Sequence, residues 1–148
     1  MTEDYHTLMI MAIAGCAVSI IIHVFTIFNM AFLTNIIPML LFILILYLYL
    51  KCSRYLKDIL RENNETSIVY LITSRIPVWL KWLVYAFGLY AIFNFLIFYI
   101  HNNKPGYIDF NVSVIKLRLV SGILTALFFA AIALIYAIKD INRKKDEL

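Results

Sequence analysis

The sequence predicts an all-α membrane protein in which four transmembrane helices form an antiparallel bundle. Of its 148 residues, 64% are hydrophobic and only 15% are charged, whereas a soluble domain carries about 25% charged residues. The apolar residues also gather in long runs, and a helix needs about 20 of them to cross a hydrocarbon core. We therefore expect one integral membrane domain over residues 1–148.

The first apolar run extends over residues 8–50 without a charged side chain, which is too long for a single crossing. Thr34-Asn35 can cap a helix, and Pro38 suits the first turn of the helix that follows. We therefore expect a first span over residues 8–33 and a second over residues 36–51, joined as a tight helical hairpin.

A polar segment over residues 52–76 follows the second span. Its first part places Arg54, Lys57 and Arg61 on one helical face, so the second helix is expected to continue beyond the membrane as an amphipathic extension. The short apolar run at residues 68–72 indicates an interfacial helix.

The third span is expected over residues 77–100. Pro77 lacks a backbone N–H, which costs nothing in the first turn of a helix. Trp79, Lys81 and Trp82 combine apolar bodies with polar tips, which is typical of residues at the headgroup boundary.

A polar connector over residues 101–116 leads to the fourth span, which is expected over residues 117–138, with a charged tail at 139–148. Within the connector, residues 107–114 alternate between apolar and polar side chains. This alternation has the period of a β-strand, so it indicates one short strand.

The distribution of Lys and Arg predicts the orientation of the bundle. Ten of the 13 basic residues lie in residues 51–81, which we call the central segment, and in the tail, and three lie on the opposite side. The three are Lys104, Lys116 and Arg118. Because basic loops stay in the cytoplasm, both termini and the central segment are expected there, in a bacterial cytoplasmic membrane. The basic residues flank apolar runs, so they favour contacts with anionic lipid over nucleic acid.

The last four residues, 145–148, spell the retention signal of lumenal endoplasmic-reticulum proteins. That signal is read in the lumen, whereas the charge count places this tail in the cytoplasm. We therefore interpret these residues as a charged helix-end sequence.

Catalytic motifs are absent from the sequence: it contains no P-loop, HExxH or GxSxG pattern, so no catalytic residue is predicted. His6, His23 and His101 fall at different depths, which argues against a bis-histidine haem. Cys16 and Cys52 show no metal-binding spacing and are expected to be reduced. We therefore predict no cofactor and no metal. No Asp or Glu lies in a predicted span, which disfavours an ion-coupled transporter.

Polar side chains in the outer half of the spans form the candidate ligand-binding site: His23, Asn94, Ser121 and Thr125. A polar side chain facing lipid would lack partners, so we expect these four to turn inward. They accompany stripes of small residues, which let membrane helices pack closely. The stripes are Gly15 and Ser19 in the first span, Gly88 and Ala91 in the third, and Gly122, Ala126 and Ala130 in the fourth.

Three short motifs occur between residues 77 and 136. They are Pro77-x-Trp79-Leu80-Lys81, Tyr90-Ala91-x-x-Asn94-Phe95 and Arg118-x-x-Ser121-Gly122. This pattern resembles small, uncharacterised four-helix bacterial inner-membrane proteins. The resemblance implies a bacterial protein with four spans and implies no activity.

Three functions remain open at this point. The first is a non-enzymatic accessory or interaction protein whose basic cytoplasmic face, formed by Arg54, Lys57 and Arg61, meets anionic headgroups or a membrane-protein partner. The second is a binder or carrier of a small lipophilic ligand in a polar pocket of the outer leaflet. The third is a membrane enzyme or a transporter subunit.

Overall fold

A computed structural model describes residues 2–28, 36–63, 68–102 and 112–146 of the chain. These residues form helices and short turns, and no strand occurs among them. The helices are α1 (Thr2–Ile27), α2 (Ile36–Asn63), α3 (Ile68–Arg75), α4 (Val78–Asn102) and α5 (Val112–Asp146). The all-α prediction is therefore confirmed.

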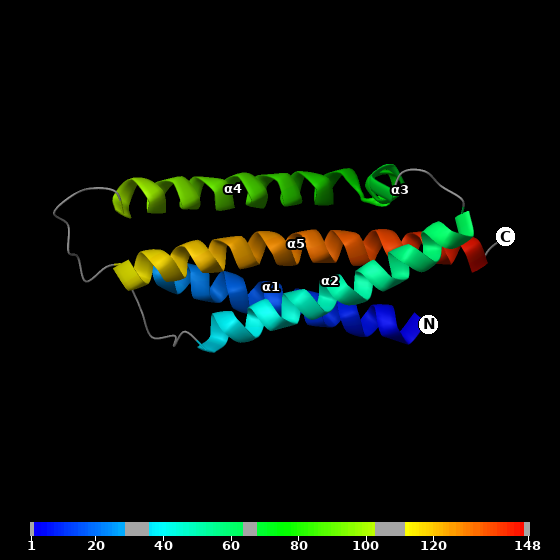
Figure 1. The fold of residues 1–148 in the computed structure, drawn as a ribbon, viewed down its shortest axis with the longest axis horizontal. Helices are drawn as coiled ribbons and strands as arrows, with labels where there is room; N and C mark the ends of the chain where they lie inside the picture. The colour runs from blue at the N-terminus through cyan, green and yellow to red at the C-terminus, as the bar shows by residue number, and fades with distance from the viewer. Residues whose placement is uncertain (1, 29–35, 64–67, 103–111, 147–148) are drawn as a thin grey trace.

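Four of these helices, α1, α2, α4 and α5, are long and apolar enough to cross a membrane. The apolar stretches are Asp4–Ile27, Ile36–Ile59, Val78–Ile97 and Lys116–Arg143. They alternate in direction, and the two ends of the chain lie at the same end of the bundle (Figure 1). We call the half of the bundle with both chain ends the terminal half and the opposite half the distal half.

Helix boundaries differ from the expected ones at several points. α1 begins at Thr2, six residues before the expected start at Leu8, because acidic residues in a first turn interact favourably with the helix dipole. It ends at Ile27, and residues 29–33 of the expected span lie outside the described residues. Pro77 precedes α4 rather than forming its first turn. Its carbonyl accepts hydrogen bonds from the backbone N–H groups of Leu80 (3.0 Å) and Lys81 (3.1 Å).

The helical extension of α2 past the apolar span is confirmed, as is the short helix α3. The strand expected over residues 107–114 is wrong where it can be checked, because residues 112–114 belong to α5 and residues 107–111 lie outside the described part. A lone strand leaves backbone groups unpaired, whereas a helix pairs them internally. α5 also continues to Asp146, so most of the expected tail is helical.

α5 is the central helix, and each of the other four packs against it. α4 lies on one side of it, while α1 and α2 lie on the other (Figure 1). One line of its buried residues recurs at alternating intervals of four and three: Leu117, Ser121, Leu124, Phe128, Ala131, Ile135 and Ile138. An average interval of 3.5 residues is typical of helices that cross at about 20° and interlock side by side.

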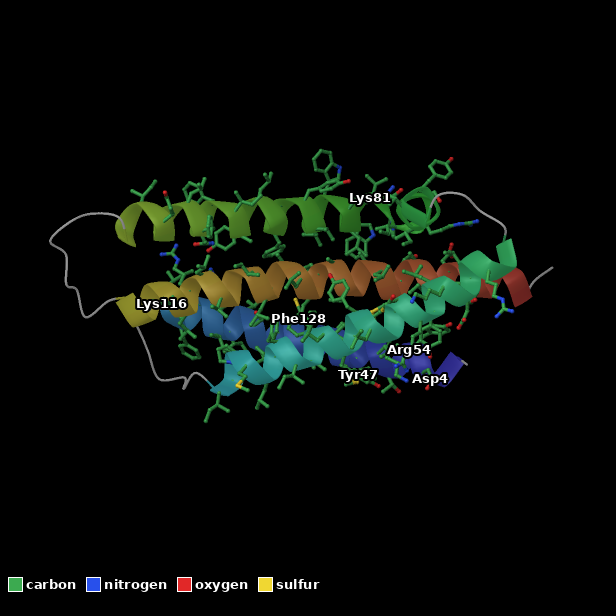
Figure 2. All side chains as sticks on the ribbon, in the orientation of Figure 1. Asp4, Tyr47, Arg54, Lys81, Lys116 and Phe128 are labelled. Carbon is green, nitrogen blue, oxygen red and sulfur yellow. The ribbon has the colours of Figure 1, made fainter. Side chains whose placement is uncertain are left out.

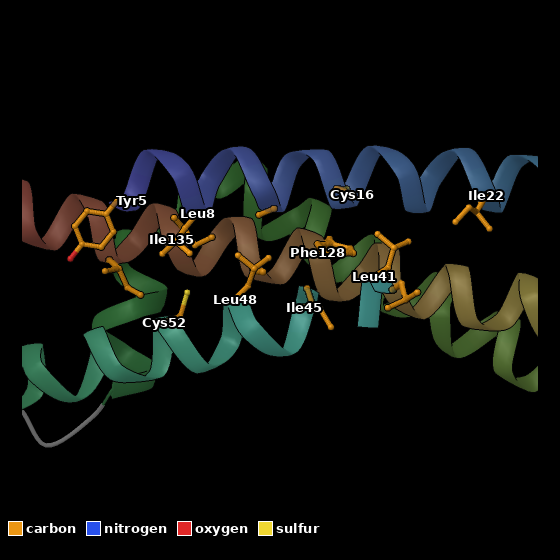
Figure 3. Close-up of a cluster of buried hydrophobic side chains, with 14 of the residues drawn as sticks. Tyr5, Leu8, Cys16, Ile22, Leu41, Ile45, Leu48, Cys52, Phe128 and Ile135 are labelled. Carbon is orange, nitrogen blue, oxygen red and sulfur yellow. The ribbon is translucent and has the colours of Figure 1, made fainter. Parts of the chain in front are cut away.

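The middle of the core is formed by Phe128, whose side chain is fully buried (Figure 3). Its ring lies between α1 and α2, and a Cβ atom added to Gly15 would overlap it. Gly15 is therefore the position at which α1 accommodates the Phe128 ring. Cys16 and Cys52 are also buried in this core, and both are free thiols.

α4 is attached to the core along one narrow face. Only 11% of its apolar stretch is buried, compared with 44% for α5. Phe87 on this face stacks on Phe129 of α5, with ring centroids 4.3 Å apart. A Cβ atom added to Gly88 would have nothing within 4 Å of it. The close helix approach expected from the small residues Gly88 and Ala91 therefore does not occur at Gly88.

Candidate functional site

The distal half holds a cluster of buried polar side chains from α1, α4 and α5. Its members are Ser19, His23, Thr26, Asn94, Ser121 and Thr125, each less than 9% exposed. We call these six residues, together with the partly buried Tyr90, the polar cluster. The helices are otherwise apolar here, so these are the groups whose polar atoms most need partners.

His23 is the centre of the polar cluster, and both of its ring nitrogens are bonded. Nδ1 lies 2.9 Å from the Ser121 hydroxyl oxygen, and Nε2 lies 2.5 Å from the Tyr90 hydroxyl. The Ser121 hydroxyl donates to the carbonyl of Arg118 at 3.1 Å. A neutral imidazole has one donor and one acceptor nitrogen. One assignment therefore satisfies all three bonds: Tyr90 donates to Nε2, and Nδ1–H donates to Ser121.

Ser19 and Thr125 extend the network one turn toward the middle of the bundle. The Thr125 hydroxyl donates to the carbonyl of Ser121 at 2.8 Å, along its own helix. The Ser19 hydroxyl lies 3.0 Å from the same carbonyl and 2.9 Å from the Thr125 hydroxyl. These bonds connect α1 directly to α5.

Asn94 and His23 both lie over Gly122 of α5. A Cβ at Gly122 would be 3.5 Å from Asn94 Nδ2 and 3.5 Å from His23 Cε1. The Asn94 side chain donates to the carbonyl of Tyr90 at 3.0 Å, on its own helix. A Cβ at Gly122 would thus make ordinary van der Waals contact with polar groups from two other helices.

The structure brings the four residues predicted from the sequence into one region. His23 and Ser121 bond directly, Asn94 lies beside His23 over Gly122, and Thr125 joins through Ser19. Sequence reasoning missed Tyr90 as a member of the polar cluster. A signal was present, because Tyr90 lies inside an apolar span, away from the boundary positions that tyrosine prefers, and four residues before Asn94.

The chemistry available to this arrangement is limited. A Ser–His pair requires a third group to orient the base, and usually that group is a carboxylate. Among the described residues, no three His, Cys, Asp or Glu side chains gather to hold a metal ion. The hydroxyl hydrogens already have acceptors, either within the polar cluster or, for Ser121, at the carbonyl of Arg118. The bonds of the arrangement join α1 to α4 and to α5.

Arg118 lies one turn beyond Ser121 at the distal edge of the polar cluster. Its Nε atom is buried, and in the described part of the chain this atom has no hydrogen-bond partner. A buried donor without a partner is costly, and a charged one more so. Arg118 is the group in this region that could still bind an additional acceptor.

The basic face expected on the extension of α2 has the predicted exposure. Arg54, Lys57 and Arg61 are all exposed, and within the described ranges none of them forms an ion pair. The other side of the same helix is held against the bundle by buried Ile59 and by Tyr55, whose ring lies 4.9 Å from that of Tyr5. The three cations therefore project from a fixed helix.

The chain matches no protein-family model, no curated protein and no solved structure. The fold and the four apolar helices define a multi-pass, all-α membrane protein.

Proposed function

We propose that this protein is a non-enzymatic interaction protein of the bacterial cytoplasmic membrane whose basic helix face binds anionic lipid headgroups. The observation that carries the proposal is the set of three exposed cations near the terminal-half end of α2, Arg54, Lys57 and Arg61, none of which forms an ion pair with a described residue. Each basic residue near an anionic membrane surface contributes about 1 kcal/mol to attraction. Because α2 is one continuous helix, the three act from a fixed position.

The test compares lipid retention by the full chain reconstituted in nanodiscs and re-extracted into mild detergent. Replacing Arg54, Lys57 and Arg61 together by Gln should lower the amount of phosphatidylglycerol that stays bound, with no change for phosphatidylcholine. A matched variant, Arg54→Lys with Arg61→Lys, keeps the charge and should retain as much as the wild type. Equal retention by the Gln variant would overturn the proposal. A protein partner recovered only with the charged forms would identify the face as a protein-binding surface instead.

The proposed orientation places this face and both chain ends in the cytoplasm, on the basis of the ten-to-three distribution of basic residues. Alkaline phosphatase fused after Leu148 should be inactive, and a fluorescent protein fused there should fluoresce. An active phosphatase would reverse the orientation and would favour the retention-signal interpretation of residues 145–148.

A second candidate is a binder of a small lipophilic ligand in the outer leaflet, and Arg118 favours it. The unpartnered Nε atom of Arg118 lies beside the polar cluster and suits a ligand that carries an acceptor oxygen. Mass spectrometry of small molecules extracted from purified protein tests this function. A molecule retained by the wild type and by Thr26→Val, but lost from both Arg118→Gln and His23→Leu, would support it. Equal retention by all four proteins, or no retained molecule, would exclude it.

A further inference from the structure

A groove of about 300 Å³ lies in the terminal half, where α3 meets α4 and α5. This volume is at the lower end of the range of ligand pockets, which is about 300–1,000 Å³. α3 lies crosswise to the long helices at this point (Figure 1). Ile72 and Thr73 of α3 and Ile76, just after that helix, line the groove together with Ala130 and Ala133 of α5. The small side chains on α5 leave the space that the groove occupies.

The lining is apolar except for the polar groups of four side chains, and two of these groups are hydrogen-bonded to backbone carbonyls. The Tyr49 hydroxyl donates to the carbonyl of Leu127 at 3.2 Å. The Thr73 hydroxyl donates to the carbonyl of Val69 at 2.7 Å. Lys81, by contrast, has no ion pair with any described residue. The groove thus combines hydrocarbon-compatible walls with one unpaired cation.

The position of Lys81 places that cation at the edge of the apolar span. It lies in the first turn of α4, whose apolar stretch begins at Val78, in the same half as Arg54 (Figure 2). Trp79 and Trp82 on either side are 62% and 69% exposed, as expected for residues at a headgroup boundary. The part of the groove lined by Lys81 is therefore at the depth where a phospholipid changes from phosphate to acyl chain.

An ion pair holds α3 over the groove. Arg75 at the end of α3 lies 3.8 Å from Asp140 of α5, and Asp140 also pairs with Arg143 at 3.0 Å. Both partners of the longer pair are partly shielded from solvent. α3 is therefore fixed against α5 as a wall of the groove.

We propose that this groove is a binding site for one anionic phospholipid of the cytoplasmic leaflet, with an acyl chain between α3, α4 and α5 and the phosphate at Lys81. The apolar lining suits a hydrocarbon chain, and the unpaired Lys81 ammonium complements an anionic headgroup. A neutral lipid would leave that charge without a counter-ion. The site shares no residue with the basic face of α2, so either proposal can fail while the other holds.

The test uses the full chain in nanodiscs that contain a phosphatidylglycerol probe with a photoreactive group midway along one acyl chain. After irradiation, mass spectrometry of the digested protein locates the labelled residues. Labelling should concentrate on the groove walls, at residues 130–134 of α5 and at Val84 and Tyr85 of α4. Labelling spread evenly over the lipid-facing side of α4, at Leu89, Ile92 and Phe93, would show ordinary contact with bulk lipid and would overturn the proposal.

Two variants separate the charge from the shape of the site. Lys81→Gln should lower labelling by phosphatidylglycerol about fivefold and leave labelling by the matching phosphatidylcholine probe unchanged. Lys51→Gln is the matched control, because Lys51 lies at the same end of the bundle but lies over the Tyr47 ring, outside the groove. It should label like the wild type, and equal losses in both lysine variants would contradict a specific site.

Ala130→Phe fills the groove without changing charge and should abolish labelling by both probes. Circular dichroism and thermal melting in detergent confirm that each variant is folded. If Ala130→Phe does not fold, Ala130→Leu replaces it. Full labelling in a folded, filled variant would show that the acyl chain lies elsewhere. Crosslinks between two copies of the chain at the groove would assign the surface to self-association instead.

Discussion

The contact between α1 and α5 changes character along its length. From Leu8 to Cys16 the two helices meet through apolar side chains, and the Phe128 ring fills the space over Gly15. Nearer the chain ends, Asn142 of α5 donates a hydrogen bond to the Tyr5 hydroxyl at 2.8 Å. From Ser19 to His23 they meet through hydroxyl and imidazole groups that bond across the interface. The two helices are therefore held together by close packing of apolar side chains around Gly15 and by hydrogen bonds around His23.

This difference separates two sources of helix association in lipid. Lipid tails are as apolar as leucine, so packing contributes through contact of closely fitted surfaces rather than through removal from water. Hydrogen bonds between membrane helices contribute only about 0.6 kcal/mol on average. We therefore expect the apolar part to supply most of the stability, while the polar cluster determines which residues of α1, α4 and α5 face one another.

The largest effect is expected from Phe128→Ala. The ring is fully buried where α1, α2 and α5 meet, so its removal leaves a cavity that three helices border. A change of this kind costs about 3–5 kcal/mol. Unfolding of the detergent-solubilised protein in increasing SDS, followed by circular dichroism, measures the loss. A cost no larger than that of His23→Leu would contradict the division between the two parts.

Gly15→Ala tests the fit of the Phe128 ring directly. The added methyl group overlaps the ring, and overpacking of this kind costs about 1–3 kcal/mol. Since the helices persist in the detergent-unfolded state, the higher helix propensity of alanine contributes little.

Gly122→Ala is the matched control, because a methyl group there makes ordinary contacts at 3.5 Å and should change stability by less than about 0.5 kcal/mol. Gly88→Ala, in open space, should be neutral as well. Similar losses at Gly15 and Gly122 would show that the ring does not determine the spacing of α1 and α5.

His23→Leu should have a smaller effect than either core change. It removes the bonds to Ser121 and Tyr90, and interhelical bonds of this type cost at most about 1.7 kcal/mol each. A loss of about 1–2 kcal/mol in the same SDS titration is expected. Cysteine crosslinking between α1 and α4 should at the same time show a wider range of pairings than in the wild type. An unchanged crosslinking pattern would show that the polar cluster does not determine which residues of α1 and α4 face each other.

The smallest effect is expected from Thr26→Val. Thr26 is as buried as its neighbours, but its hydroxyl bonds only to the carbonyl of His23 at 2.7 Å, on its own helix. That carbonyl keeps its helical partner, so stability should change by less than about 0.5 kcal/mol. A loss similar to that of His23→Leu would mean that burial of a polar group, rather than bonding between helices, determines the cost.

The sequence by itself determined where the apolar helices lie and that there are four of them. Charged residues and capping residues interrupt the apolar runs. A membrane interior tolerates neither unpaired charges nor backbone groups without hydrogen bonds, so each uninterrupted apolar run of sufficient length predicts a helical span. The extension of α2 and the short helix α3 followed from the same reasoning about amphipathic faces. The buried polar group at His23, Asn94, Ser121 and Thr125 could also be anticipated, because polar side chains in lipid turn toward one another.

Only the tertiary structure decided which apolar face of each helix packs inward. In water, burial separates apolar from polar residues, but in a span that is apolar on every side the lipid-facing and buried residues have the same chemistry. Hydrophobic periodicity therefore could not predict that Phe128 lies over Gly15 or that Gly88 faces open space. It also could not predict the bond between Tyr90 and His23. Those contacts depend on how side chains fit across helices, and the groove beside Lys81 depends on where α3 crosses the bundle.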